Sequence, residues 1–374
     1  MSARKTNRFE MMTRCLPTGA LLALALVAPG SAGCGVGAGN ATAEVSHATE
    51  GAGGATDPAG RGCAVGTANP PTRLECTGLF AASSPSSIAP NLAPDVLEYS
   101  PAVPLWADGA KKRRFIRLPP GTTIDTRDMD EWVFPVGTKL WKEFSLAGRK
   151  IETRYLEKRS DGTWLRTTYA WSDDESHATE VTEGAHDVRG TGYDIPSQTE
   201  CSVCHAGALD GVLGFEAIGL SSPGATGLTM QELIGRGLLS SPPAKPLVVP
   251  GAPLDVAALG WLHANCGNAC HNRTENSAAG WTGLHMRLTI DGLASVKDTD
   301  TFKTAVGIAS SFQPSPKTSL LRIAPGDPAD SAIPFRDGAR AAQGSPVGWQ
   351  MPPIATNVPD VADVDTVKAW IRSL

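Results

Sequence analysis

The chain has 374 residues and a formal net charge of −5, with 41% hydrophobic and 19% charged residues. This apolar content is enough to build a folded core, so the composition argues against intrinsic disorder. The weak acidity argues against a nucleic-acid partner, which would require a basic face. A chain of this length predicts two domains after any export segment.

Residues 1–33 have the pattern of a secretory signal peptide. Four basic residues precede an apolar run from Gly19 to Ala28, which is too short for a bilayer span of about 20 residues. Cleavage after Ala32 is one interpretation. The other is an imperfect lipobox, Ser31-Ala32-Gly33-Cys34, in which Cys34 becomes a lipidated N-terminus. We therefore expect an exported protein, periplasmic or tethered to the outer membrane, whose only membrane contact is a lipid on Cys34.

Residues 34–75 are predicted to be a flexible tether. Gly, Ala, Thr and Ser dominate this stretch, and few large apolar side chains are present to order it. Cys63 and Cys76 lie near its end without adjacent histidines. In an oxidising compartment such a pair favours a disulfide, which stabilises a loop of this size by about 3 kcal/mol.

Residues 76–194 are predicted to form an antiparallel β domain of the sandwich type. Runs of alternating side chains rich in Thr, Tyr, Trp and Ile cover residues 115–118, 131–134, 139–146, 150–159 and 163–171. Asp161-Gly162 between the last two runs indicates a hairpin. The basic run Lys111-Lys112-Arg113-Arg114 is interpreted as a solvated strand or turn, with docking of an anionic partner as the alternative.

From Cys201 onward the sequence is typical of short helices separated by long loops. Residues 229–239 and 255–264 place apolar side chains at three- and four-residue spacing, each behind a Thr or Asp suited to an N-cap. A terminal helix is expected over residues 361–374, capped by Asp360 or Asp363. Together with the β domain, this pattern predicts an α+β multidomain protein whose second half is mainly α-helical.

The segment Cys201-Ser202-Val203-Cys204-His205 has the spacing of covalent haem attachment. Two thiols at this separation reach the two vinyl groups, and a histidine directly after the second thiol binds the iron from the proximal side. A structural zinc site and a thioredoxin-like dithiol also use Cys-x-x-Cys, but export and the missing βαβ setting weaken both alternatives. We predict haem c at Cys201 and Cys204, with His205 as an iron ligand, in a first haem-binding segment over residues 195–250.

The segment Cys266-Gly267-Asn268-Ala269-Cys270-His271 is a second candidate, with one more residue between the thiols. Gly267 and Asn268 tolerate left-handed backbone geometry, so a bulge would keep both thiols near the vinyl groups. The alternatives are a disulfide or a zinc knuckle formed by Cys266, Cys270 and His271. We predict a second haem c here, with His271 as the proximal ligand, in a cytochrome c-like domain over residues 251–374.

Met351 is the predicted sixth ligand of the second iron. It lies in Gln350-Met351-Pro352-Pro353, where two prolines stiffen the backbone and hold the thioether toward a metal. A lone methionine more often packs in a core, and this is the alternative.

His263 is the candidate sixth ligand of the first iron, with a buried, hydrogen-bonded histidine as the alternative. It precedes Cys266 by three residues on a predicted helix. His285 and Met286 are weaker candidates, and Met230 is expected in the core.

Three phrases of the sequence resemble a family of secreted dihaem c-type cytochromes, in which a β-rich domain precedes two haem motifs. They are Ile195-Pro196-Ser197-Gln198-Thr199-Glu200, Trp261-Leu262-His263-Ala264-Asn265-Cys266 and Cys270-His271-Asn272. The resemblance covers about Leu105 to the C-terminus, includes Met351-Pro352-Pro353, and departs from the family pattern in the extra residue of the second motif. It implies two haems and electron transfer, without an established substrate.

The leading hypothesis is a dihaem electron carrier whose β domain docks a redox partner protein. A thioether ligand raises the potential of the iron relative to a second imidazole, so Met351 on one iron and His263 on the other would give electron flow a direction. The alternatives are a dihaem peroxidase-like enzyme with one open haem iron, and a haem-free binding protein with zinc or disulfide clusters. No catalytic residue is assigned.

Overall fold

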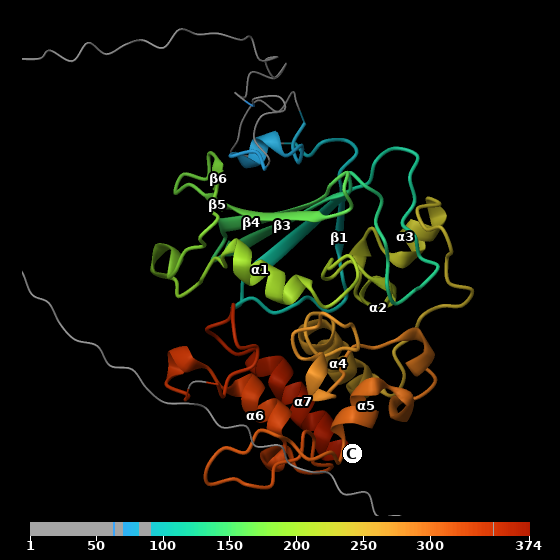
Figure 1. The fold of residues 1–374 in the computed structure, drawn as a ribbon, viewed down its shortest axis with the longest axis vertical. Coiled ribbons are helices and arrows are strands. Elements are labelled where there is room, and N and C mark those ends of the chain that lie inside the picture. The colour runs from blue at the N-terminus through green and yellow to red at the C-terminus, as the bar shows by residue number, and fades with distance from the viewer. Residues whose placement is uncertain (1–62, 64–69, 82–90, 347) are drawn as a thin grey trace, which may run out of the picture. The chain divides into compact units, whose positions relative to one another are not determined.

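The computed structural model describes Cys63 and residues 70–81, 91–346 and 348–374, all within one unit that runs from Gly53 to Leu374 (Figure 1). The predicted signal peptide, the lipobox at Cys34 and most of the predicted tether lie outside these residues. The disulfide predicted between Cys63 and Cys76 is confirmed, with the two Cα atoms 5.4 Å apart. No helix in the described part of the chain is long and apolar enough to cross a membrane.

A seven-stranded antiparallel sheet is the main feature of the first half, with the order β6-β5-β4-β3-β2-β1-β7. Its strands are β1 (Leu97–Ser100), β2 (Lys111–Arg117), β3 (Lys139–Leu146), β4 (Arg149–Lys158), β5 (Trp164–Trp171), β6 (Ala178–Glu180) and β7 (Thr226–Gly227). Four of the five predicted runs are therefore confirmed as strands, and the predicted hairpin joins β4 to β5. The strand predicted over residues 131–134 is wrong, because Val133 forms only an isolated bridge there, with Asp125.

The described residues form this one sheet, so the expected sandwich of two sheets is wrong. One face packs against α2 (Ala217–Ser221) and α3 (Met230–Gly235) through the core that contains Ile116, Leu140 and Phe215. Helix α1 (Gln198–His205) contacts β5. The other face packs against the chain around Leu74 and Leu79. Both faces are thus covered without a second sheet, as the ribbon shows (Figure 1).

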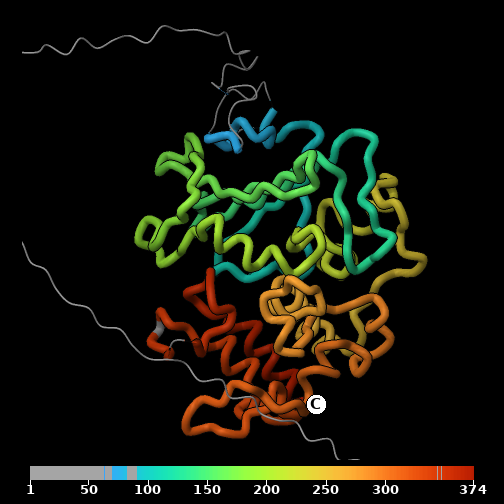
Figure 2. Tube along the Cα trace, viewed as in Figure 1, coloured from blue at the N-terminus to red at the C-terminus, as the bar shows by residue number. Residues whose placement is uncertain are grey.

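The predicted haem-binding segment over residues 195–250 packs as part of the sheet domain. Its strand β7 pairs with β1, and its apolar side chains share a core with the sheet. In the Cα trace the chain leaves the sheet after α3 and then stays among the C-terminal helices (Figure 2). Residues of this segment therefore share a core with the sheet, within the one unit that runs from Gly53 to Leu374.

Helices and long loops make up the C-terminal half. The helices are α4 (Pro253–Leu262), a π-helix (His263–Gly267), α5 (Asp300–Ala305), α6 (Ala332–Gly338) and α7 (Val361–Ser373). Short 3-10 helices in this half cover Gly280–Thr282, Ile290–Gly292, Val296–Asp298, Pro328–Asp330 and Ala341–Gln343, and two more in the first half cover Leu74–Cys76 and Val188–Gly190. Leu259 and Leu262 of α4 pack against Val367 and Trp370 of α7, and Asp360 caps α7. The three helices predicted from periodicity are confirmed, and the chain is an α+β protein.

Candidate functional site

Helix α1 carries the first motif and begins with a capping box. The Ser197 hydroxyl accepts a hydrogen bond from the Glu200 N–H at 3.3 Å, and the Glu200 carboxylate accepts from the Ser197 N–H at 2.9 Å. Such a box satisfies two backbone donors that a helix start otherwise leaves free. The box therefore fixes the helix on which Cys201, Cys204 and His205 follow.

His205 is held as a neutral imidazole with one nitrogen free. Burial lowers its pKa to about 3, with Lys142 and Arg166 acting in the same direction. Its Nδ1 contacts the Gly211 carbonyl oxygen, which can only accept, so Nδ1 carries the proton and Nε2 keeps a lone pair. Histidines that bind metals usually donate their other ring N–H in this way.

Gly211 is required for this arrangement of His205. Its φ is +60°, and a Cβ at this position would overlap the carbonyl group of His205 and lie 2.9 Å from the Arg166 guanidinium. A larger residue would therefore push the acceptor away from the imidazole.

The thiols of the first motif are free and protonated. Cys201 and Cys204 form no disulfide, and burial raises the pKa of each, opposed mainly by the Arg154 charge. Cys204 also lies at the edge of the cavity described below.

The second motif continues helix α4 through a π-turn, which absorbs its extra residue. The Asn268 N–H donates to the His263 carbonyl and the His271 N–H donates to the Cys266 carbonyl, both five residues back and both at 2.9 Å. Single π-turns of this kind insert one residue into a helix. Asn268 has a φ of −62°, so the expected left-handed bulge is wrong. Gly267 is needed for space, because a Cβ there would overlap the Arg287 backbone.

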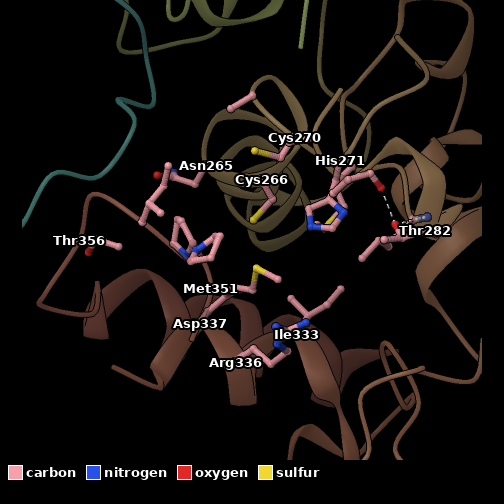
Figure 3. A pocket seen from close by; sticks show the side chains of 18 of the residues that line it. Asn265, Cys266, Cys270, His271, Thr282, Ile333, Arg336, Asp337, Met351 and Thr356 are labelled. Atoms are coloured by element: carbon pink, nitrogen blue, oxygen red, sulfur yellow. Dashed lines mark hydrogen bonds between the residues drawn. The ribbon is translucent and has the colours of Figure 1, made fainter. Parts of the chain in front are cut away.

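A cavity of about 450 Å³ separates the second motif from Met351. Cys266, Cys270 and His271 lie on one side, and the Met351 thioether points toward them from the other (Figure 3). Cofactor sites generally have about 300–1,000 Å³ and mostly apolar walls. The apolar residues of this cavity include Leu105, Val203, Trp261, Leu284, Met286, Phe312, Ile333 and Ile354. In size, lining and donor set, these residues fit a haem held between His271 and Met351.

His271 has the electrostatic state that an iron ligand requires. Burial lowers its pKa to about 4, and the backbone carbonyl of Leu284 acts in the opposite direction. The imidazole is therefore neutral at pH 7. Cys266 and Cys270 are free, so the disulfide alternative for this pair is wrong. Burial raises the pKa of both thiols.

Charged side chains from α6 and the loop after it line the same cavity. Burial raises the pKa of Asp337 to about 7, although Arg340 and Arg336 oppose this shift. Arg340 donates to the Met351 carbonyl at 3.1 Å, and Arg336 donates to the backbone carbonyls of Gly348 and Trp349. These bonds hold the Met351 loop against α6. These contacts cannot be predicted from the sequence, because guanidinium-to-carbonyl contacts have no fixed spacing.

His263 is not placed to bind the first iron, and its alternative role as a buried histidine is confirmed. Its Nδ1 accepts from the Leu288 N–H at 2.9 Å, which puts the proton on Nε2. Nε2 lies 3.4 Å from the Glu216 carboxylate and 3.2 Å from the Asn268 amide. Both ring nitrogens are thus engaged, and no lone pair is left for a metal. Of the weaker candidates, Met286 lines the cavity, and Met230 packs in the sheet core as expected.

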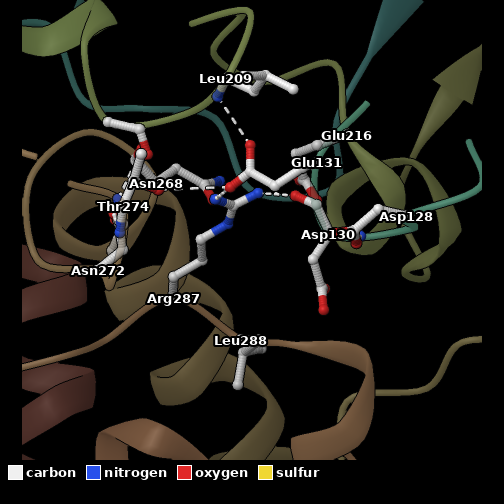
Figure 4. A network of polar contacts seen from close by, with 12 residues as sticks. Asp128, Asp130, Glu131, Leu209, Glu216, Asn268, Asn272, Thr274, Arg287 and Leu288 are labelled. Carbon is white, nitrogen blue, oxygen red and sulfur yellow. Dashed lines mark hydrogen bonds and ion pairs between the residues drawn. The ribbon is translucent and has the colours of Figure 1, made fainter. Parts of the chain in front are cut away.

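The segments that directly follow the two motifs are hydrogen-bonded to each other. The Asn272 amide donates to the Gly207 carbonyl and to the Gly267 carbonyl, both at 2.8 Å. Glu131 joins the same network, because it accepts from the Leu209 N–H at 2.8 Å and pairs with Arg287 (Figure 4). Sequence reasoning missed these residues, although Asn272 directly follows His271.

No match was found when the chain was compared with protein-family models, with curated proteins and with solved structures. Within the described ranges, no group of three or more His, Cys, Asp or Glu side chains is placed to hold a metal ion. The zinc knuckle of Cys266, Cys270 and His271 therefore has no geometric support.

Proposed function

We propose that this chain is an exported dihaem c-type cytochrome that transfers electrons to or from a redox partner protein. Haem c would be attached at Cys201 and Cys204 and at Cys266 and Cys270. The C-terminal half would be its cytochrome c-like domain. The disulfide near the N-terminus is compatible with an oxidising compartment.

The cavity between His271 and Met351 is the observation that carries this proposal. It brings together two thiols, a neutral imidazole and a thioether from segments 80 residues apart, since 351 − 271 = 80. A structural role alone would not require a thioether and two free thiols around a space of this size. Haem, when bound, supplies an iron that accepts and releases one electron.

Each residue of the two sites has a defined task in this proposal. His205 and His271 present neutral imidazoles, and the Gly211 carbonyl orients the first ring. Met351 presents a thioether, a ligand that raises the potential relative to a second imidazole. The mostly apolar wall would lower the polarity around the second haem, which favours the less charged, reduced state.

Haem staining of the heat-denatured protein on a gel tests the proposal, because a thioether-linked haem survives denaturation. We expect two haems per chain in the wild type and one in each of the variants Cys204→Ala and Cys266→Ala. Cys63→Ala also removes one thiol but breaks only the disulfide, and this control should keep both haems. A colourless wild-type band would reject the proposal and favour a haem-free binding protein.

A dihaem peroxidase-like enzyme is the second candidate, and one observation favours it. His263 is engaged by Leu288 and Glu216, so the residue predicted to close the first iron does not reach it. An iron without a sixth protein ligand is open to a small molecule. Absorption spectra of the reduced protein with and without carbon monoxide separate the two, because a carrier with two six-coordinate irons should show little change.

A further inference from the structure

Three basic side chains stand directly opposite one another on the sheet face that α1 covers. The register pairs Arg114 of β2 with Lys142 of β3, and Lys142 with Arg154 of β4. Thr168 of β5 continues the row. Because directly opposed residues of neighbouring strands point to the same face, the three basic side chains form one continuous row, here called the cationic row, and Thr168 lies at its end.

The cationic row has too few acidic partners among the described residues. Glu152 binds Arg154 at 2.7 Å and also accepts from the Tyr193 hydroxyl at 2.6 Å. The side chains of Arg114 and Lys142 make no hydrogen bond or ion pair with another described residue, although Arg114 is only 3% exposed. Like charges directly opposite each other destabilise a sheet, and burial increases the cost.

Two further polar atoms on this face are buried without a partner. They are Nε of Arg166, which lies two residues before Thr168 on β5, and Oγ1 of Thr168 itself. Buried polar groups in proteins are nearly always hydrogen-bonded, so such atoms require an explanation. An anionic group in contact with this face would satisfy the donors and neutralise the row.

The first motif lies on the same face. Helix α1 contacts β5, and a Cβ at Gly211 would overlap the His205 carbonyl oxygen and lie 2.9 Å from the Arg166 guanidinium, so this guanidinium lies beside the end of α1. The charge of Arg154 also acts on both thiols of α1, and that of Lys142 acts on His205. Figure 1 shows α1 running along this side of the sheet. A group attached to Cys201 and Cys204 would therefore meet the row directly.

We infer that the cationic row, together with Arg166 and Thr168, binds the carboxylates of the tetrapyrrole that is attached at Cys201 and Cys204. The inference rests on the proposed function and deepens it, because it makes the sheet a wall of the first haem site. Arginine suits this task, since its planar guanidinium binds a carboxylate through two parallel hydrogen bonds. Lys142 adds a point charge between the two arginines.

The test compares Lys142→Met in two backgrounds. With haem at the first motif, this substitution removes a carboxylate partner, so the urea midpoint should fall. In the Cys201→Ala, Cys204→Ala background, which lacks this haem, the same substitution relieves repulsion within the row, and the midpoint should rise. Lys139→Met is the matched control, because Lys139 lies on the opposite face of β3 and has its own partner, Glu157. Its effect should be the same in both backgrounds.

A redox titration gives a second, independent measurement. Lys142→Met should lower the midpoint potential of the first haem, because a positive charge beside the carboxylates favours the reduced state, and should leave the second haem unchanged. Arg166→Met should act in the same direction. An unchanged potential in both variants, or the same sign of stability change in both backgrounds, would overturn the inference.

Succinate distinguishes attached carboxylates from a free dicarboxylate. Stabilisation of the haem-loaded wild type by succinate, lost in Lys142→Met, would mean that the row is open to solution, and this too would overturn the inference. Haem staining of the same samples keeps the two questions apart. Absence of haem from the first motif rejects the proposed function, whereas its presence without the shifts rejects only the role of the row.

Discussion

The two cysteine–histidine motifs lie in different environments, although Val203 and Cys204 of the first reach the edge of the cavity beside the second. The first is on a capped α-helix against the charged face of a sheet, and the charges of Lys142, Arg166 and Arg154 help burial to lower the pKa of its histidine. The second is on a π-turn beside a cavity with mostly apolar walls, and Met351 faces it. The two motifs thus share a similar attachment chemistry but differ in the polarity of their surroundings. Two haems bound at these motifs would differ in reduction potential for that reason alone.

The largest effect on this comparison is expected from Gly267→Ala. The new Cβ would overlap the Arg287 backbone, so the free energy of unfolding should fall by about 3 kcal/mol, and the second haem should be lost while the first remains. Urea unfolding and haem counting measure both effects. Gly235→Ala is the control, because Gly235 lies in α3 with open space around it and should gain a little stability. Equal behaviour of the two variants would contradict the packing argument.

Met351→Ala should remove the difference in ligation between the two sites. Loss of the thioether lowers the potential of the second haem on the order of 0.1 V, a part of the roughly 0.8 V range that axial ligands span. The reduced protein should then bind carbon monoxide at this iron. Met286→Leu keeps the volume of another cavity methionine and should change neither property. An unaltered potential in Met351→Ala would show that this residue is no ligand.

Asn272→Ala should loosen the connection between the motifs. It removes hydrogen bonds to the Gly207 and Gly267 carbonyls and leaves these groups buried, at a cost of about 2 kcal/mol in unfolding free energy. Chemical denaturation measures this loss. Asn357→Ala provides the comparison, because Asn357 also bonds to two groups but at the surface, and its loss should cost about 0.5 kcal/mol. Similar losses in both variants would argue against a special role for Asn272.

The smallest effect is a pH dependence confined to the second half. Burial and the neighbouring Asp360 raise the pKa of Asp363 to about 6, above its ordinary value. As the pH rises from about 4 to about 6, the Asp363 carboxyl ionises in the unfolded state while it stays protonated in the folded state. The free energy of unfolding therefore falls over this range and stays lower above it. Asp363→Asn should be more stable than the wild type above pH 6, by less than about 1 kcal/mol after solvent screening, and equal below pH 4. Thermal unfolding of both proteins at several pH values between 4 and 7 measures this. If the difference in stability between the variant and the wild type does not change with pH, the idea is wrong.

The strands of the sheet could be predicted because β-branched and aromatic side chains alternate along them. The exception, residues 131–134, has the same alternation, but the Phe134 N–H donates to the Asp210 carboxylate at 2.7 Å and not to a neighbouring strand. A partner 76 residues away in sequence cannot be seen from a local pattern. Tertiary contact therefore decided between strand and loop.

In the candidate site, too, local residue patterns could be predicted from the sequence and contacts between distant segments could not. The cysteines, His205, His271 and Met351 are visible in the sequence as spaced residue types, and the structure places Met351 opposite His271. His263 was misjudged as a ligand because Leu288 and Glu216, which occupy its nitrogens, lie on other segments. The cationic row cannot be predicted from the sequence, because it depends on the register of three strands. Only one part of it, the basic run that ends at Arg114, stands out in the sequence.

The hydrogen bond between Asn272 and Gly207 joins positions 65 residues apart in the chain. It connects the sheet half to the helical half just after the end of each motif. Local unfolding of either half at this point would therefore break the bond and expose its partner in the other half. The two halves should therefore unfold as one cooperative unit, and a calorimetric scan should show a single transition whose van't Hoff enthalpy equals its calorimetric enthalpy.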